Sequence, residues 1–192
     1  CCQYFDEDAS NPYTPSAYTW PSDMPNEKQL ELRSELQRLI KLLNLGTSIY
    51  NIETRVGVDG KAYIMEVSPR GGGNRLSELL KYASGQDLIE NNVRAAIGIP
   101  CIEMNDPVYN GAWAEYIVHS DRDGIFEGLE IDDDIRSKVL VEEDIWVNKG
   151  DKVKSFTGAN ETLGTLVLKF NSHMEAMEML KKHREWLKVI VK

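Results

Sequence analysis

The chain has 192 residues, of which 42% are hydrophobic and 28% are charged. This composition is typical of a folded globular protein and excludes a disordered tail. A net charge of −9, without a local cluster of basic residues, argues against a nucleic-acid partner. No apolar run approaches the roughly 20 residues of a membrane-spanning helix, so we expect no membrane partner either.

The cysteines and the first residues favour a cytoplasmic protein that is part of a longer one. Cys1, Cys2 and Cys101 are odd in number and lack metal-ligand spacing, which is typical of reduced thiols. The N-terminus does not have the basic and apolar regions of a signal peptide. Because the chain begins with Cys and not Met, we expect a piece of a longer polypeptide.

Residues 1–25 contain four prolines, which exclude a long helix and predict an extended N-terminal segment lying against a surface. A helix is predicted over 27–45, with Asn26 and Gln29 as a capping box and Gly46 as its end. Five apolar residues at helical spacing form its core stripe: Leu32, Leu36, Leu39, Ile40 and Leu43.

Two strands are predicted next, over 48–56 and 61–68, and Asp59-Gly60 between them is a strong hairpin signal. Helices at 74–83 and 88–97 follow. Gly85 should end the first helix, and Asp87 with Glu90 should cap the second. The second helix is expected to turn three apolar residues inward: Ile89, Val93 and Ile97.

Beyond a linker over 101–111, the pattern becomes mostly β. Ser172 and Glu175 are expected to cap a helix over 173–184, and a strand closes the chain. We therefore divide the chain into an N-terminal segment (1–25), a first domain (26–104) and a β-rich domain with a terminal helix (105–192). Four strands are predicted in the last domain before its helix: 112–119, 124–131, 138–147 and 163–170.

Two glutamates are predicted to face each other across the first hairpin. If Asp59-Gly60 forms a two-residue loop, Glu53 lies directly opposite Glu66. Asn51 then lies opposite Ser68. Directly opposed side chains have Cβ atoms about 4.5–5.5 Å apart, so the two carboxylates repel. A bound cation relieves this repulsion, and an all-oxygen site suits Mg²⁺ or Mn²⁺ with nucleotide phosphates completing its ligands. The alternative is an exposed hairpin face whose glutamates diverge into water.

A glycine-rich segment follows Glu66 directly. Arg70 can bind a phosphate or carboxylate through two parallel hydrogen bonds. Gly71, Gly72 and Gly73 let the backbone approach a ligand closely, and they precede a helix start, where amides attract anions. A glycine triplet alone also fits a flexible turn. Together with the hairpin, this segment predicts a site for a metal-bound phosphate.

These motifs resemble the ATP-grasp superfamily. The matching stretches are Asn-Ile-Glu-Thr-Arg at 51–55, Asp-Gly-Lys at 59–61 and Glu-Val-Ser-Pro-Arg-Gly-Gly-Gly at 66–73. The specific resemblance covers 46–100 and is greatest to the biotin carboxylase and carbamoyl-phosphate synthase branch. Residues 112–192 more loosely resemble the domain that follows ATP-grasp in such ligases. The implied fold class is α+β: the C-terminal half of an ATP-grasp fold, with antiparallel strands and helices, and then a smaller β-rich domain.

The resemblance implies roles for the matching residues. Glu53 corresponds to a magnesium-coordinating glutamate, and Glu66 to the glutamate that bridges two metal ions. Arg70 corresponds to an arginine that stabilises the acyl-phosphate or its transition state. Ser68 departs from the family, which usually has asparagine as a metal ligand there, and a hydroxyl is a weaker ligand. The implied nucleotide-binding residues are Arg70, Gly71, Gly72, Gly73 and Asn74.

The implied activity is that of an ATP- and Mg-dependent ligase, with Mn²⁺ as an alternative metal. It activates a carboxylate or bicarbonate as an acyl-phosphate and joins it to an amine or similar nucleophile. The family's phosphate-covering loop, its nucleotide-contacting lysines and its adenine pocket have no counterpart in residues 1–45. We therefore expect an upstream part of the same polypeptide to supply them and the isolated chain to be inactive.

The competing hypothesis is a non-catalytic binding or dimerisation module, acting as a homodimer, with a degenerate metal site. Ser68 is the feature that favours it. The histidines add no candidate site, because His119, His173 and His183 are scattered and are predicted to form no ligand set.

Overall fold

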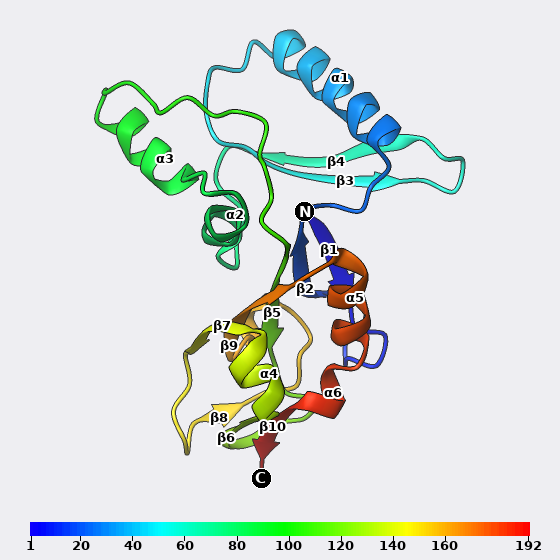
Figure 1. Cartoon of the computed structure of the whole chain (residues 1–192), viewed down its shortest axis with the longest axis vertical. Coiled ribbons are helices and arrows are strands. Elements are labelled where there is room, and N and C mark those ends of the chain that lie inside the picture. Colours follow the sequence, from blue (N-terminus) through cyan, green and yellow to red (C-terminus); the bar gives the residue numbers. More distant parts are fainter. The chain divides into compact units, whose positions relative to one another are not determined.

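The computed structural model describes all 192 residues, which form two compact units (Figure 1). The first unit comprises 1–22, 82–84 and 108–192, and the second comprises 23–81 and 85–107. None of the helices combines the length and apolar character needed to cross a membrane.

The second unit is built around a two-stranded antiparallel hairpin. Helix α1 lies against it, and the Glu31 carboxylate accepts a hydrogen bond from the backbone N–H of Ala62 at 3.1 Å. Helix α2 begins in this unit and ends in the other. The elements are α1 (Asn26–Leu42), β3 (Asn51–Val56), β4 (Ala62–Ser68), α2 (Leu76–Ser84) and α3 (Leu88–Ala96).

Helix α1 is present as predicted, but both of its ends differ from the prediction. Asn26 is its first residue and Pro25 occupies the capping position, so the expected capping box with Gln29 does not form. The helix ends before Gly46 because Asn44 adopts the left-handed conformation, with φ at 51°. Asparagine tolerates that conformation better than most residues, so it ends the helix in place of the glycine.

The ends of α2 and α3 are closer to expectation. Gly85 ends α2 in a left-handed conformation, with φ at 76°. Asp87 caps α3 by accepting a hydrogen bond from the N–H of Glu90 at 2.8 Å.

The face of α3 was predicted wrongly. Ile89, Val93 and Ile97 are 48%, 54% and 66% exposed. The buried residue of the helix is Asn91, whose side-chain amide exchanges two hydrogen bonds with the backbone of Ile102, at 2.7 and 2.9 Å. The helix is thus held by a polar contact with the chain that follows it, and its apolar face stays uncovered in this chain.

The first unit contains a five-stranded antiparallel sheet with the order β1-β2-β5-β9-β7 and a three-stranded sheet with the order β10-β6-β8. The larger sheet consists of β1 (Cys2–Phe5), β2 (Pro15–Trp20), β5 (Ala112–Val118), β9 (Gly164–Phe170) and β7 (Leu140–Ile145). The smaller sheet consists of β10 (Leu187–Val191), β6 (Gly124–Ile131) and β8 (Lys152–Val153).

The N-terminal segment is not a separate extended piece. It forms β1 and β2, and β2 pairs with β5, where Ala17 lies opposite Tyr116. The sequence gives no sign of this pairing, because the two strands are far apart along the chain.

Short helices complete the unit: α4 (Asp133–Lys138), α5 (His173–Lys181), α6 (His183–Trp186) and one 3₁₀ turn (Ala159–Glu161). Helix α4 lies before β7, so the strand that was predicted to begin at residue 138 begins at Leu140. Ser172 caps α5 as predicted, accepting from the N–H of Glu175 at 3.2 Å. The predicted helix over 173–184 divides in two, and the closing strand β10 pairs with β6.

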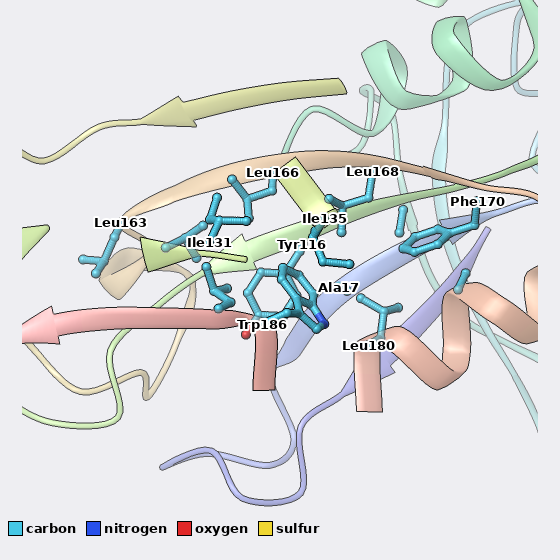
Figure 2. Close-up of a cluster of buried hydrophobic side chains, with 14 of the residues drawn as sticks. Ala17, Tyr116, Ile131, Ile135, Leu163, Leu166, Leu168, Phe170, Leu180 and Trp186 are labelled. Atoms are coloured by element: carbon cyan, nitrogen blue, oxygen red, sulfur yellow. The ribbon is translucent and has the colours of Figure 1, made fainter. Parts of the chain in front are cut away.

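The core of this unit gathers side chains from both sheets and from the helices (Figure 2). Leu166 and Leu168 of β9 are fully buried, as is Leu180 of α5. Ile135 of α4 and Trp186 of α6 cover the same cluster. Burying such side chains stabilises a fold by about 1.5–3 kcal/mol each, so this core gives the unit a rigid frame.

Candidate active site

The β3–β4 hairpin brings the two predicted carboxylates together. Glu53 lies opposite Glu66, and Asn51 lies opposite Ser68, as predicted. The loop, however, has three residues instead of two. The N–H of Gly57 donates to the carbonyl of Lys61 at 2.8 Å and closes the loop.

A β-bulge restores the predicted register. The longer loop alone would shift all pairs by one residue, and Thr54 indeed lies opposite Ile64. Between this pair and the glutamates, Met65 is an extra residue in β4, which is the mark of a bulge. The bulge moves the register back by one, so Glu66 returns to the position opposite Glu53. The prediction of the pair was therefore correct, although its assumed loop was wrong.

Each of the opposed carboxylates has a partner on its own strand. Oε1 of Glu53 lies 2.7 Å from Nη2 of Arg55. Oε1 of Glu66 accepts a hydrogen bond from the hydroxyl of Ser68 at 2.6 Å. These contacts offset part of the repulsion between the two carboxylates. The hydrogen bond from Ser68 also holds the Glu66 carboxylate in place.

Arg70 lies at the start of the glycine segment. Its side chain is exposed, and Nη1 donates to the carbonyl of Gly71 at 2.8 Å. A guanidinium has five N–H donors in a fixed fork, and this bond uses one of them. The arginine is therefore bonded to the segment with donors left for an anion.

The glycine segment packs closely against the hairpin. A Cβ added to Gly72 would come within 2.7 Å of Leu76 and 3.1 Å of the Asn51 side-chain oxygen. A Cβ at Gly73 would meet nothing within 4 Å. One glycine thus lets the backbone pass between hairpin and helix, whereas the next borders open space.

Helix α2 begins two residues later than predicted. Asn74 and Arg75 both adopt left-handed conformations, with φ at 52° and 60°. No side chain caps the helix start, although Arg75 forms an ion pair with Glu78 in the first turn. Two left-handed residues in succession are uncommon outside glycine, and such strain occurs most often at functional sites.

The histidines were predicted to be scattered, but the structure brings two of them close to one carboxylate. Nε2 of His119 and Nε2 of His183 lie 3.9 and 3.4 Å from Oδ2 of Asp6. The three residues come from the loop after β1, the end of β5 and the start of α6. No spacing along the sequence could have revealed the group, because the fold alone brings these segments together.

Comparison with known proteins places this geometry in context. No family model matches the chain. Among curated proteins, it is 30% identical over 112 residues to the uncharacterized protein y4rH of Sinorhizobium fredii, covering 58% of this chain and 23% of that protein. It is 28% identical over 92 residues to carnosine synthase 1 of Gallus gallus, covering 48% of this chain and 10% of that protein.

Several solved structures match nearly the whole chain, among them three ligases. An L-amino acid ligase from Bacillus licheniformis has a TM-score of 0.81 at 17% identity, covering 96% of this chain and 46% of that one. A phosphoribosylglycinamide synthetase from Anaerococcus prevotii has a TM-score of 0.74 at 20% identity, covering 100% and 48%. A biotin carboxylase from Campylobacter jejuni has a TM-score of 0.68 at 14% identity, covering 95% and 41%.

This chain has the ATP-grasp fold. All three structures are ATP-grasp ligases, which confirms the resemblance and the mixed helix and antiparallel-strand architecture expected from the sequence. The chain spans less than half the length of these structures and less than a quarter of the two curated relatives. The branch within the superfamily stays a prediction.

Proposed function

We propose that this chain forms the metal- and phosphate-binding end of the active site of an ATP-dependent ligase. The observation that carries the proposal is Glu53 opposite Glu66, followed at once by Ser68, Arg70 and the glycine segment. Found within an ATP-grasp fold, this combination supports the roles that the resemblance implies.

The residues at the hairpin fit a Mg²⁺ ion. Their donors are all oxygens, and Mg²⁺ is typically bound by one or two carboxylates together with substrate phosphates. Glu53 and Glu66 would hold it, with Ser68 as a weaker third ligand or as support for Glu66 through its 2.6 Å hydrogen bond. When bound, the ion offsets negative charge on the phosphates, and Mn²⁺ would serve in the same way.

Other residues of the chain would bind the phosphates directly, Arg70 through its charge and the glycine segment through its backbone. Arg70 would release the Gly71 carbonyl and bind the oxygens of the acyl-phosphate, where charge develops. The backbone of Gly72 and Gly73, with Asn74, would approach the phosphates where no side chain intervenes. Phosphate transfer depends mainly on positioning and charge stabilisation, so these groups account for one part of the catalytic machinery.

The reaction that we propose for the whole protein has two steps. A carboxylate oxygen attacks the terminal phosphorus of ATP, so that an acyl-phosphate forms and ADP leaves. An amine then attacks the acyl carbon, and phosphate leaves. The match to an L-amino acid ligase favours amino acids as substrates, and the greater length of the matched proteins supports an upstream part that completes the site. Cytoplasmic location and a homodimer remain predictions.

Turnover by the full-length protein tests the proposal. Phosphate release from MgATP should depend on a carboxylate and an amine, screened first among the amino acids. Glu66→Gln should reduce it at least about 100-fold. The matched control is Glu103→Gln, an exposed glutamate outside the hairpin, which should retain full activity.

The non-catalytic alternative predicts a different result. Ser68 in the position of the family's asparagine favours a degenerate metal site. If no substrate pair supports turnover, or if Glu66→Gln turns over like the unmodified protein, the ligase proposal fails and the binding or dimerisation module takes its place.

A further inference from the structure

A second group of ionisable side chains lies in the unit of residues 1–22 and 108–192 and shares no residue with the hairpin site. It surrounds a cavity of about 380 Å³, whose lining includes His119, Asp121, His183 and Arg184. Asp6 contacts the same histidines from the loop after β1. Asp6, His119 and His183 are no more than 5% exposed, so polar and charged atoms are concentrated here away from water.

The two imidazoles are oriented alike. Nδ1 of His119 lies 2.7 Å from the carbonyl oxygen of Ile117, and Nδ1 of His183 lies 3.0 Å from that of Leu180. A carbonyl oxygen only accepts hydrogen bonds, so each Nδ1 carries the proton. In its neutral form each ring therefore has its lone pair on Nε2, the atom that lies near Oδ2 of Asp6. Backbone carbonyls orient metal-binding histidines in this same way.

Donor atoms of three of these residues are spaced for a single ion. Ligand atoms of Asp6, His119 and Asp121 all lie within 4.8 Å of one another. Tetrahedral ligands with bonds of about 2.0 Å are about 3.3 Å apart, so small side-chain movements would bring these three around one ion. His183 lies outside this group, but its Nε2 is 3.4 Å from Oδ2 of Asp6, and its ring would have to turn toward the ion to become the fourth ligand.

Aromatic packing holds the rings in position. Phe156 stacks on His119 with ring centroids 4.3 Å apart, and Tyr116 lies 5.8 Å from His119 and 5.3 Å from His183. Phe156 and Tyr116 are themselves fully buried.

Arg184 is the cation that these carboxylates bind in the structure. Its Nη2 lies 2.8 Å from Oδ2 of Asp6 and 3.3 Å from Oδ1 of Asp121. The arginine side chain is 39% exposed, so it has room to turn away from the carboxylates. Arginine and a metal ion would therefore compete for the same oxygens.

We propose that Asp6, His119, His183 and Asp121 form a binding site for one divalent transition-metal ion of the zinc type. Two imidazole nitrogens with two carboxylate oxygens suit Zn²⁺ or Co²⁺ far better than Mg²⁺, which prefers oxygen alone. The site is thus chemically distinct from the one proposed on the hairpin. Because it needs no nucleotide, it stands or falls independently of the ligase function.

Cobalt(II) titration of the complete 192-residue chain, treated beforehand with chelator, tests the site. We expect a visible d–d absorption band that saturates at one ion per chain and is abolished by added Zn²⁺. Zn²⁺ should also raise the melting temperature, because a ligand that binds only the folded state stabilises it. Glu66→Gln and His173→Gln, which alter the hairpin site and a histidine outside the cluster, should bind like the unmodified chain.

The ligand variants decide the outcome. His119→Gln and Asp121→Asn should each weaken Co²⁺ binding at least about tenfold. The Asp121 side chain is 58% exposed, so Asp121→Asn should fold even if His119→Gln does not. Arg184→Gln removes the competing cation, so this variant should bind Co²⁺ more tightly than the unmodified chain. Absence of the band, unchanged binding by Asp121→Asn, or weaker binding by Arg184→Gln would show that the cluster is an ion-pair network and overturn the proposal.

Discussion

Glu53 and Glu66 illustrate how a like-charged pair persists in this fold. Each carboxylate takes one partner from its own strand, Arg55 for Glu53 and Ser68 for Glu66. These partners offset part of the repulsion. The register keeps the two residues directly opposite each other, which is the arrangement that a shared metal site requires.

Glu66→Gln should leave the melting temperature of the 192-residue chain unchanged or raise it. The substitution removes a repulsion worth up to about 1 kcal/mol, and the amide oxygen can still accept the hydrogen bond from Ser68. Thermal unfolding by circular dichroism measures the difference. Glu53→Gln is the control, because it also breaks the contact with Arg55 and should gain less. A clear loss of stability in Glu66→Gln would mean that the carboxylate supports the fold instead of a ligand.

At the residue level, local sequence predicts the hairpin site well but misses contacts between distant segments. Glu53 and Glu66 lie within one hairpin, so strand alternation and the turn signal bring them close to opposite positions, and the bulge at Met65 completes the pairing. Asp6, His119 and His183 come from three elements, and their proximity depends on how those elements pack. No pattern of spacing encodes that packing.

Among the helices, α3 shows which features are local and which depend on neighbours. Its cap was predicted because Asp87 and Glu90 are three residues apart and interact within one turn. The buried face of the helix was not predicted correctly, because the contact made by Asn91 depends on where the following segment lies.

Asp87→Ala should destabilise α3 by about 1 kcal/mol at pH 7, the usual cost of losing a helix cap. The hydrogen bond from Lys81, followed by that from the Glu90 N–H, lowers the pKa of Asp87 in the folded state. A lowered folded-state pKa means that the carboxylate stabilises the fold above its unfolded-state value. This contribution is lost as the pH falls through the folded-state value.

Urea unfolding at several pH values checks this prediction. The difference between the unmodified chain and Asp87→Ala should be constant near neutrality and should shrink below about pH 4. Asp106→Ala provides the control, because its side chain is 90% exposed and caps no helix. A difference that persists undiminished in strong acid would assign the loss to packing rather than to the charged cap.

The β-strands show the same division between local and distant information. Strand β6 was predicted at its observed bounds. The β3–β4 register was predicted correctly for Glu53 and the residues before it, because a bulge at Met65 compensates for a longer loop, but it was wrong by one residue between the bulge and the loop. Strands β1 and β2 were missed, since the prolines of residues 1–25 indicate extended chain and the pairing of β2 with β5 is not local. The ATP-grasp resemblance supplied the fold class of the chain, but it did not include residues 1–25 and so did not predict this pairing either.

For the molecule as a whole, most of the residues before the hairpin already form other elements, so few are left to bind the triphosphate and the adenine. Residues 1–22 contribute β1 and β2 to the five-stranded sheet, and α1 occupies Asn26–Leu42. The matched ligase structures are more than twice as long as this chain. These facts support the expectation that another part of the parent protein covers the triphosphate and the adenine.

The isolated chain should therefore bind MgATP weakly and hydrolyse none of it. Phosphate transfer depends on positioning and on charge stabilisation from several sides of the phosphates. A chain that supplies only one side is expected to lose most of the positioning and most of the charge stabilisation. Mg²⁺ also binds a pair of carboxylates weakly unless phosphates add ligands. Calorimetry with Mg²⁺ and ATP, together with a phosphate-release assay, measures both quantities, and Glu66→Gln gives the background. Micromolar affinity, or phosphate release above that background, would contradict the prediction and would mean that Glu53, Glu66 and Arg70 belong to a more complete site within these 192 residues.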